Sequence, residues 1–209
     1  MDNAFRRQFA AQLAAIRTLS PVDLLSTSER WTRTIENIGV NGFISFQGKT
    51  YQTVEIGEYR ETSDNHEKIL DSSWQELKLF CIETGKTVYL EWEKDDDIII
   101  YVTIEELEFS EISDEEGDEI DEDDLDQITE DEDSLFYQGE EFEYEDDCAA
   151  IYLRNKNAQG EKLWLYDFED KSGNCITIEE WMTDGKEEYK LFLSTKLSPN
   201  AIEVISIGG

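Results

Sequence analysis

The sequence has few of the residues from which catalytic and metal sites are usually built. It contains one histidine and three cysteines in 209 residues. His66 stands in the polar stretch TSDNHEK without the base and acid that a nucleophilic site needs beside it, so we expect an exposed loop residue. Cys81, Cys148 and Cys175 are far apart and odd in number, with no C-x-x-C pair. This spacing excludes a zinc ribbon and a disulfide framework and indicates buried, reduced thiols.

Local signatures of enzymes are also missing. The patterns G-x-S-x-G, G-x-x-x-x-G-K-[ST], H-E-x-x-H and G-x-G-x-x-G do not occur. Paired carboxylates such as Glu179 beside Glu180, or Glu58 near Glu61, are expected by chance in a chain with 51 acidic residues. The sequence therefore predicts no catalytic residue, no metal site and no cofactor, and an enzyme of unknown reaction is only a third alternative.

Basic residues are scarce as well. Lysine and arginine number 18 against 51 acidic residues, which gives a net charge of -33. A surface of this sign repels nucleic acid and anionic lipid, so the expected partners are a protein with a basic surface, a polyamine or a weakly held divalent cation. No apolar run approaches the roughly 20 residues of a membrane span, and no signal peptide opens the chain. We expect a cytoplasmic protein.

Most of the negative charge lies in one segment. From Glu105 to Asp147 there are 24 acidic residues and no basic one. Such a composition predicts a mobile, disordered acidic linker, placed at residues 111–134. The segment does not fit an EF-hand, because Gly117 as the sixth loop residue would put Ile112 at the first ligand position.

The first 39 residues predict a helical segment. Phe5, Phe9, Leu13 and Ile16 recur at helical spacing. The helix can dock on its own protein, on a partner or on a membrane surface, and we favour its own protein or a partner, because an acidic body is repelled by anionic lipid. The candidate partner-binding residues are Phe5, Phe9, Leu13, Ile16, Arg6 and Arg7.

From Val40 onward the apolar period changes to two, which predicts strands. FQGKTY at residues 46–51 is echoed by YQGEEF at 137–142, and the strand pattern of 77–92 by that of 163–181. We interpret this as a duplication with copies at 43–109 and 135–207. The predicted fold is mainly β: a duplicated antiparallel β-meander, as small barrels or a sandwich, with domains at 1–39, 40–110, 111–134 and 135–209. Both faces of the strand at 163–168 are apolar, which favours burial on both sides.

The strings FQGKTYQTVEIGEYRE, SWQELKLF and GKTVYLEWE resemble a bacterial family of the domain-of-unknown-function series, number 4178. The resemblance covers about residues 40 to 207. It implies a non-enzymatic protein encoded near phage-shock-type membrane-stress proteins and polyamine-synthase-like genes, and no catalytic residue.

Together these features predict a non-enzymatic cytoplasmic binding or adaptor protein, in a bacterial membrane-stress setting. The alternative is an acidic nucleic-acid mimic, or a chaperone that binds a basic protein or a polyamine.

Overall fold

The computed structural model describes residues 3–20, 23–30, 32–94, 97–122, 124–155, 157, 160–183 and 186–209, and it is mainly β. This confirms the predicted fold class at that level, together with the N-terminal helix. The helices and 3-10 turns are α1 (Asn3–Thr18), α2 (Thr27–Arg30), η2 (Ile35–Asn37), η3 (Phe109–Glu111), α3 (Leu125–Asp131) and η4 (Pro199–Ala201). The strands are β1 (Phe43–Phe46), β2 (Lys49–Thr62), β3 (Ile69–Cys81), β4 (Thr87–Lys94), β5 (Ile98–Leu107), β6 (Ile112–Ser113), β7 (Leu135–Tyr137), β8 (Glu140–Arg154), β9 (Glu161–Asp170), β10 (Asn174–Thr183), β11 (Lys186–Lys196) and β12 (Glu203–Ser206).

The order of strand pairing is β12-β1-β2-β3-β4-β5-β11-β10-β9-β8-β7-β6, and β8 also pairs with β2. From β2 to β8 the pairing thus closes on itself through eight strands, as in an antiparallel barrel. The sequence is compatible with small barrels and with a sandwich, and the observed strand pairing is that of a single eight-stranded barrel.

The chain divides into two compact units. Unit 1 comprises Met1–Gly57, Gln75–Ile100 and Leu197–Gly209, and unit 2 comprises Glu58–Trp74 and Tyr101–Lys196. The strands β2, β3 and β5 run from one unit into the other, so neither unit is a continuous segment. The domain boundaries expected from the sequence stay predictions.

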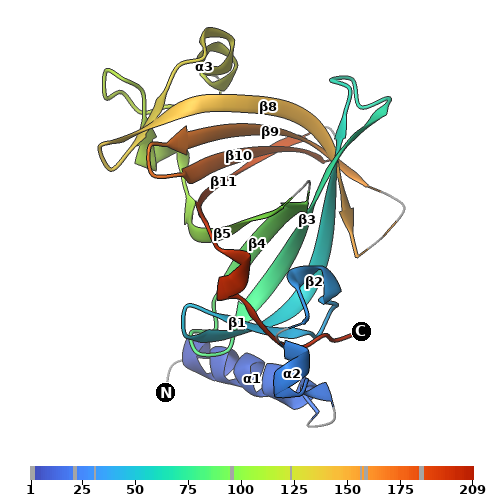
Figure 1. Ribbon diagram of the computed structural model, residues 1–209. Helices are drawn as coiled ribbons and strands as arrows, with labels where there is room; N and C mark the ends of the chain where they lie inside the picture. Colours follow the sequence, from blue (N-terminus) through green and yellow to red (C-terminus); the bar gives the residue numbers. More distant parts are fainter. Residues whose placement is uncertain are drawn as a thin grey trace. The chain divides into compact units, whose positions relative to one another are not determined.

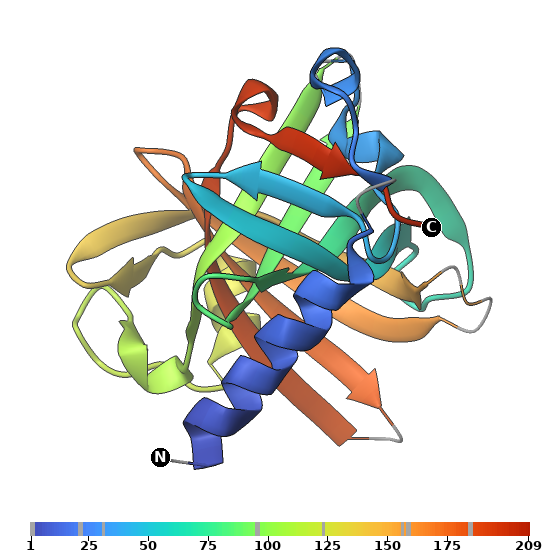
Figure 2. The same ribbon diagram turned by 90° about the horizontal axis from the view of Figure 1, so that it is seen from below.

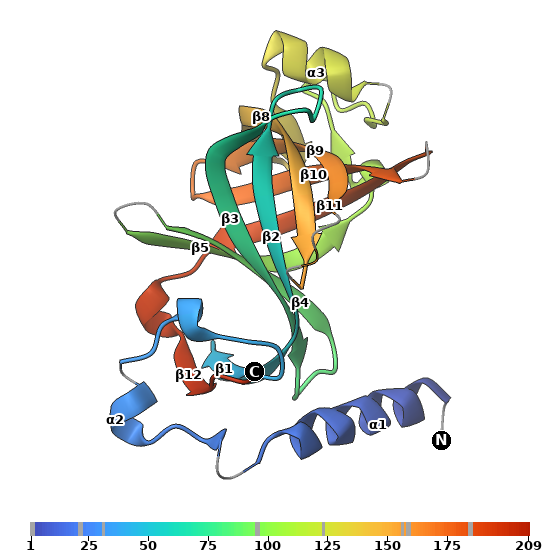
Figure 3. The same cartoon turned by 90° about the vertical axis from the view of Figure 1, so that its right-hand side faces the viewer.

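Unit 1 is built on the hairpin of β1 and β2, to which β12 adds as a further antiparallel strand. The segment around α2 is fastened to β12: the Leu25 amide donates to the carbonyl of Ile205 over 3.0 Å, and Arg30 Nη1 lies 2.9 Å from Glu203 Oε1. Figure 3 shows α2 beside β12. No helix in the described ranges is both long and apolar enough to cross a membrane.

Unit 2 is built on the antiparallel sheet of β8, β9, β10 and β11, which lie side by side in Figure 1. Strand β9 packs on both faces, as predicted. Leu163 and Leu165 belong to one buried cluster and Tyr166 and Phe168 to another, because successive side chains of a strand point to opposite faces.

Two hairpin turns share one backbone conformation. Gln47 and Gly48 have φ of 49° and 72°, and Gln138 and Gly139 have φ of 51° and 85°. Two central residues with positive φ form the type I′ turn, whose twist matches that of the flanking strands. The two predicted Gln-Gly turns are therefore confirmed as turns.

The acidic segment is ordered, and this corrects the prediction of a disordered linker at residues 111–134. Ile112, Ile120, Leu125 and Ile128 are 1%, 3%, 1% and 8% exposed, and all four belong to the larger apolar cluster of unit 2. Full burial of such a side chain stabilises by about 1.5–3 kcal/mol. The average composition of the segment hides these four anchors, and a prediction from mean charge was wrong for that reason.

Candidate functional site

Helix α1 rests on unit 1 through amide side chains. Gln8 Nε2 donates to the carbonyl of Thr84, and Gln12 Nε2 donates to the carbonyl of Ile82 over 2.9 Å. Both carbonyls lie in the turn between β3 and β4, and Figure 2 shows the helix beside this turn. Ala15, on the same helix face, is only 5% exposed. The helix therefore docks on its own protein through the Gln8, Gln12 and Ala15 face.

The predicted partner-binding residues lie on a neighbouring face of α1. Phe9 and Ile16 are 52% and 51% exposed, and they stand seven residues apart, so they share one side of the helix. Leu13 lies between them and is half-buried, and Arg7 is exposed. We call Phe9, Leu13 and Ile16 the α1 stripe. The two remaining predicted residues, Phe5 and Arg6, have side chains outside the described part of the chain.

The acidic segment of unit 2 forms a fixed surface. Its four anchors hold the backbone, and the Asp114 carboxylate accepts hydrogen bonds of 2.9 Å from the amides of Glu116 and Asp118. Gly117 has φ of 87° in this turn. Between Glu105 and Asp147 most of the described acidic side chains are exposed. We call them the acidic surface, which differs from a mobile linker because the carboxylates stand at fixed positions.

A buried carboxylate lies on the other side of the unit 2 sheet. Glu179 is 3% exposed. Its Oε1 accepts a hydrogen bond of 2.7 Å from the Tyr59 hydroxyl, and its Oε2 accepts one of 2.8 Å from Trp181 Nε1. Burial raises the pKa of Glu179, and the two hydrogen bonds oppose this shift because they favour the charged form.

Aromatic rings surround this carboxylate. The ring of Tyr59 stacks on Trp74 with 5.1 Å between centroids and lies 4.7 Å from Tyr152. Tyr152 in turn meets Trp181 edge-on at 5.4 Å, and Lys190 Nζ lies 4.6 Å from the centroid of the Trp181 ring. A carboxylate in such apolar surroundings is costly unless it is hydrogen-bonded, and both of its oxygens are.

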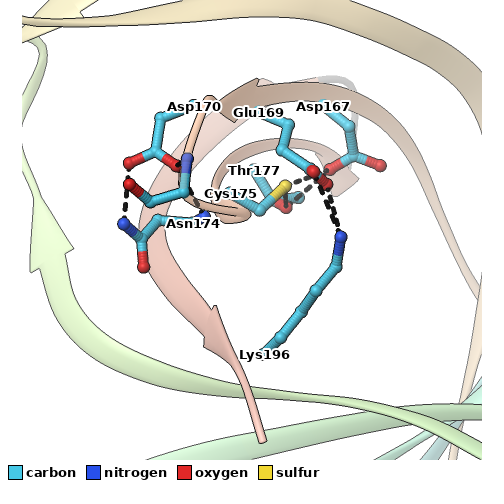
Figure 4. A network of polar contacts seen from close by, with 8 residues as sticks. Asp167, Glu169, Asp170, Asn174, Cys175, Thr177 and Lys196 are labelled. Carbon is cyan, nitrogen blue, oxygen red and sulfur yellow. Dashed lines mark hydrogen bonds and ion pairs between the residues drawn. The ribbon is translucent and has the colours of Figure 1, made fainter.

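A second carboxylate on this sheet, that of Asp167, also has a raised pKa. Thr177 Oγ1 donates to Asp167 Oδ1 over 2.6 Å, and Cys175 Sγ lies 3.9 Å from the same oxygen. Figure 4 shows these three side chains converging. Burial raises the pKa of Asp167 to about 6, and Asp146, which stands directly opposite on β8, adds to the shift. Like charges directly opposite on neighbouring strands repel each other.

The remaining contacts of Figure 4 close the turn between β9 and β10 and join β9 to β11. Lys196 Nζ lies 3.0 Å from Glu169 Oε2, and Asn174 Nδ2 donates to Asp170 Oδ2 over 2.7 Å. Burial alone raises the pKa of Asp170, but hydrogen bonds from Asn174 and the turn amides outweigh it and lower the pKa. These contacts have the character of a closed turn rather than of an open site.

The histidine and the cysteines do not form a nucleophilic site. His66 lies in a turn, as predicted, but it is partly buried rather than exposed, and its Nε2 lies 3.0 Å from the carbonyl of Leu163. All three cysteines are free thiols, and Cys81 is buried as predicted. Burial raises the pKa of Cys148 to about 12, which keeps this thiol protonated at neutral pH. Within the described part of the chain, no group of three or more metal-ligating side chains is placed to hold an ion.

Sequence reasoning missed Glu179 and Asp167. Glu179 was set aside as one acid among many, yet it alternates with Thr177 and Trp181 along β10 and so shares their face. Its neighbour Glu180 points to the opposite face, where it accepts a hydrogen bond of 2.9 Å from the Tyr166 hydroxyl. The alternation along β10 places Glu179 on the face of Trp181, but no local signal marks it as the buried acid, because Glu29 also stands two residues before a tryptophan and is exposed.

The comparisons with known proteins bear on the family alone. Neither the curated proteins nor the solved structures include a match to this chain. A family model described as domain of unknown function (DUF4178) matches residues 39–199, which is most of the chain and agrees with the resemblance found in the sequence. The chain belongs to this DUF4178 family.

Proposed function

We propose that this protein is a non-enzymatic binding or adaptor protein that contacts a protein partner through helix α1. The observation that supports the proposal is the exposure of Phe9 and Ile16 on a helix that is already held by its neighbouring face. A bacterial membrane-stress setting, which the family resemblance implies, belongs to the same proposal, and so does the cytoplasmic location expected from the sequence.

The α1 stripe lies on a helix that is already ordered and docked. Gln8 and Gln12 fix the helix, so a partner does not have to order it on binding. Phe9 and Ile16 each keep about half of their surface in water, and covering that half stabilises a complex by about 1 kcal/mol per side chain. A pre-ordered helix with an exposed apolar stripe is a common form of docking element.

The test is a comparison of two double variants of the full chain. In the first, Phe9→Ser and Ile16→Ser remove the stripe; in the control, Ala10→Ser and Ala14→Ser change exposed alanines of the same helix. Each protein is used for quantitative affinity purification from its cell of origin, and each is melted by circular dichroism. We expect the first variant to lose the partner and keep its melting temperature.

An unchanged set of captured proteins in the first variant would refute the role of the stripe. A large fall in melting temperature would show instead that the stripe packs within the protein.

A second candidate function is the binding of a basic protein by the acidic surface, as a nucleic-acid mimic or a chaperone. The observation that favours it is the anchoring of the segment by Ile112, Ile120, Leu125 and Ile128, because mimicry of a phosphate array requires carboxylates at fixed positions. Replacing Glu115, Glu122 and Glu130 by glutamine removes three exposed charges without removing an anchor. Binding to a basic partner that is unchanged by this triple variant at low salt would exclude the idea.

We also propose that the two β-meanders arose by duplication, with copies at 43–109 and 135–207. The pairing order supports this, because exchanging β1–β6 for β7–β12 leaves the order the same when it is read from the other end. Each copy opens with a Gln-Gly type I′ turn. An experimental structure in which β1–β5 cannot be superposed on β7–β11 strand for strand would contradict it.

A further inference from the structure

A pocket of about 520 Å³ opens in unit 1, at the C-terminal end of α1. This volume lies within the usual range for small-molecule sites, about 300–1,000 Å³. Its walls include Thr18 from the end of α1, Asn41 from the turn before β1 and Ser206 from β12, together with Asp23, Leu24, Leu25 and Glu29. None of these residues belongs to the α1 stripe or to the acidic surface.

The walls of the pocket are fixed by the fold. Gln52 is 6% exposed, and its Nε2 donates to Thr18 Oγ1 over 2.9 Å and to Asn41 Oδ1 over 3.1 Å, which joins two walls. The opposite side is formed where the end of the chain crosses Gly42, on which a Cβ would lie 2.9 Å from the carbonyl oxygen of Ile207. Glycine is required at this crossing, so the wall is held by close backbone packing.

The lining of the pocket carries hydrogen-bonding groups. Ser206 is 1% exposed, and it is the hydroxyl-bearing residue that β12 contributes to the lining of the pocket. The side-chain oxygen of Asn41 accepts the hydrogen bond from Gln52, and its amide nitrogen can donate one to a ligand. A ligand that brings an oxygen to this end can accept a hydrogen bond from each group.

The charge of the pocket is of one sign. Asp23 and Glu29 are the charged residues of its lining, and both are acidic. Hydrogen bonds from the Ser26 hydroxyl and amide, 2.6 Å and 2.9 Å long, lower the pKa of Glu29, and the positive charge of Arg33 adds to this effect from outside the lining. Leu24 and Leu25 also line the pocket and give it an apolar part. The complement of such a lining is a cation with an apolar body.

We propose that this pocket binds a small organic ammonium compound that also carries a hydroxyl group. The ammonium group lies at Asp23 and Glu29, the hydroxyl lies at Ser206 and Asn41, and the carbon chain between them contacts Leu25. The inference does not rest on the proposed role of α1, because it uses a different surface of unit 1.

The test uses four probes of equal chain length: 6-amino-1-hexanol, 1,6-diaminohexane, 1,6-hexanediol and adipate. Each is titrated into the isotopically labelled full-length protein and followed by amide chemical shifts. We expect 6-amino-1-hexanol to shift the amides of Thr18, Leu25, Asn41 and Ser206, the diol to bind at least several-fold more weakly, and adipate to bind not at all.

Variants assign the binding groups. Glu29→Gln and Ser206→Ala should each weaken the amino alcohol roughly fivefold, as expected for one partly exposed polar contact. Glu93→Gln is the matched control, since Glu93 is an exposed acid of unit 1 outside the lining, and it should leave binding unchanged. The diamine should bind Ser206→Ala and the unaltered protein equally well, because it brings no hydroxyl.

Three results overturn the proposal. Equal binding of the diol and the amino alcohol would show that the pocket does not select a cation. Equal weakening by Glu29→Gln and Glu93→Gln would show diffuse attraction to a negative protein. Shifts confined to residues outside the lining, or no shift up to the solubility limit of the probe, would show that the pocket does not bind this class. None of these results depends on the α1 stripe variants.

Discussion

Leu125→Ala tests whether the acidic segment is part of the folded structure. Leu125 is 1% exposed and packs in the cluster of unit 2 although acidic residues surround it in the sequence. Alanine has a higher helix propensity than leucine, so the change does not weaken α3 itself. Any loss of stability must therefore come from packing.

The expected loss follows from the atoms removed. Three carbons beyond Cβ contribute about 0.8 kcal/mol each on burial, or about 2.4 kcal/mol together, and the cavity left behind raises the cost to about 3 kcal/mol. For a chain of 209 residues that unfolds in one step, this corresponds to a fall in melting temperature of roughly 6–12 °C.

Urea unfolding followed by circular dichroism measures the change, and Leu24→Ala is the matched control because Leu24 is 42% exposed. We expect the control to cost less than half as much. A loss below about 0.5 kcal/mol for Leu125→Ala, the scale of ordinary surface substitutions, would refute the packing argument and restore the mobile linker.

Three further predictions concern the sheets and turns. The pKa of Asp167 is raised to about 6 from an unfolded value near 3.8, so the stability that this group contributes is fully present below about pH 4 and is lost as the pH rises through 6. Between pH 4 and pH 7 this amounts to about 2.4 kcal/mol, and Asp167→Asn should remove that difference from the free energy of unfolding measured in urea. The same pH dependence of the unfolding free energy in both proteins would contradict the prediction. Tyr59→Phe should lower the free energy of unfolding by about 1–3 kcal/mol, because it leaves the Glu179 carboxylate with one fewer hydrogen-bond donor. The loss should be smaller in a Glu179→Gln background. A double-mutant cycle without coupling between the two positions would exclude the Tyr59–Glu179 hydrogen bond as the cause. Gly48→Ala should lower the free energy of unfolding by about 1 kcal/mol through the φ of 72° alone, since a Cβ there meets no atom within 4 Å. Gly42→Ala should cost more, because a Cβ there lies 2.9 Å from backbone oxygens. Thermal melts that rank the two variants the other way would show that the chain crossing at Gly42 is loosely packed.

The sequence predicted those parts of the fold that depend on local pattern. Alternation along β9 and the Gln-Gly pairs indicated strands and tight turns, because side-chain direction and turn geometry are set within a few residues. It did not predict which strands close the pairing. The contact of β8 with β2 joins residues far apart in the chain, and no local feature encodes it.

The acidic segment shows how an average can mislead. Net charge and mean hydropathy describe residues 111–134 as a chain that cannot fold alone, and this is sound for an isolated segment. Ile112, Ile120, Leu125 and Ile128 are few, but a neighbouring sheet offers them a ready apolar surface. A search for isolated apolar residues within acidic runs would have found them.

Glu179 was hidden for the opposite reason. The local pattern places it beside Trp181 on one face of β10, but a chain with 51 acids gives no sign of which acid is buried. Burial was decided by Tyr59, which comes from β2 and is 120 positions away. Which residue pairs with a buried carboxylate depends on the tertiary fold, so the local sequence does not predict the Tyr59–Glu179 contact.

The two candidate functions differ in how they depend on charge, and salt separates them. Helix α1 is held on unit 1 by the neutral amide groups of Gln8 and Gln12, and the exposed side chains of the α1 stripe are apolar. Among the described side chains, therefore, neither the docking of the helix nor its proposed contact with a partner depends on ion pairs. The acidic surface acts through exposed carboxylates, whose fields are screened beyond about 8 Å at physiological ionic strength. A partner retained as salt is raised therefore belongs to α1, and a partner released belongs to the acidic surface.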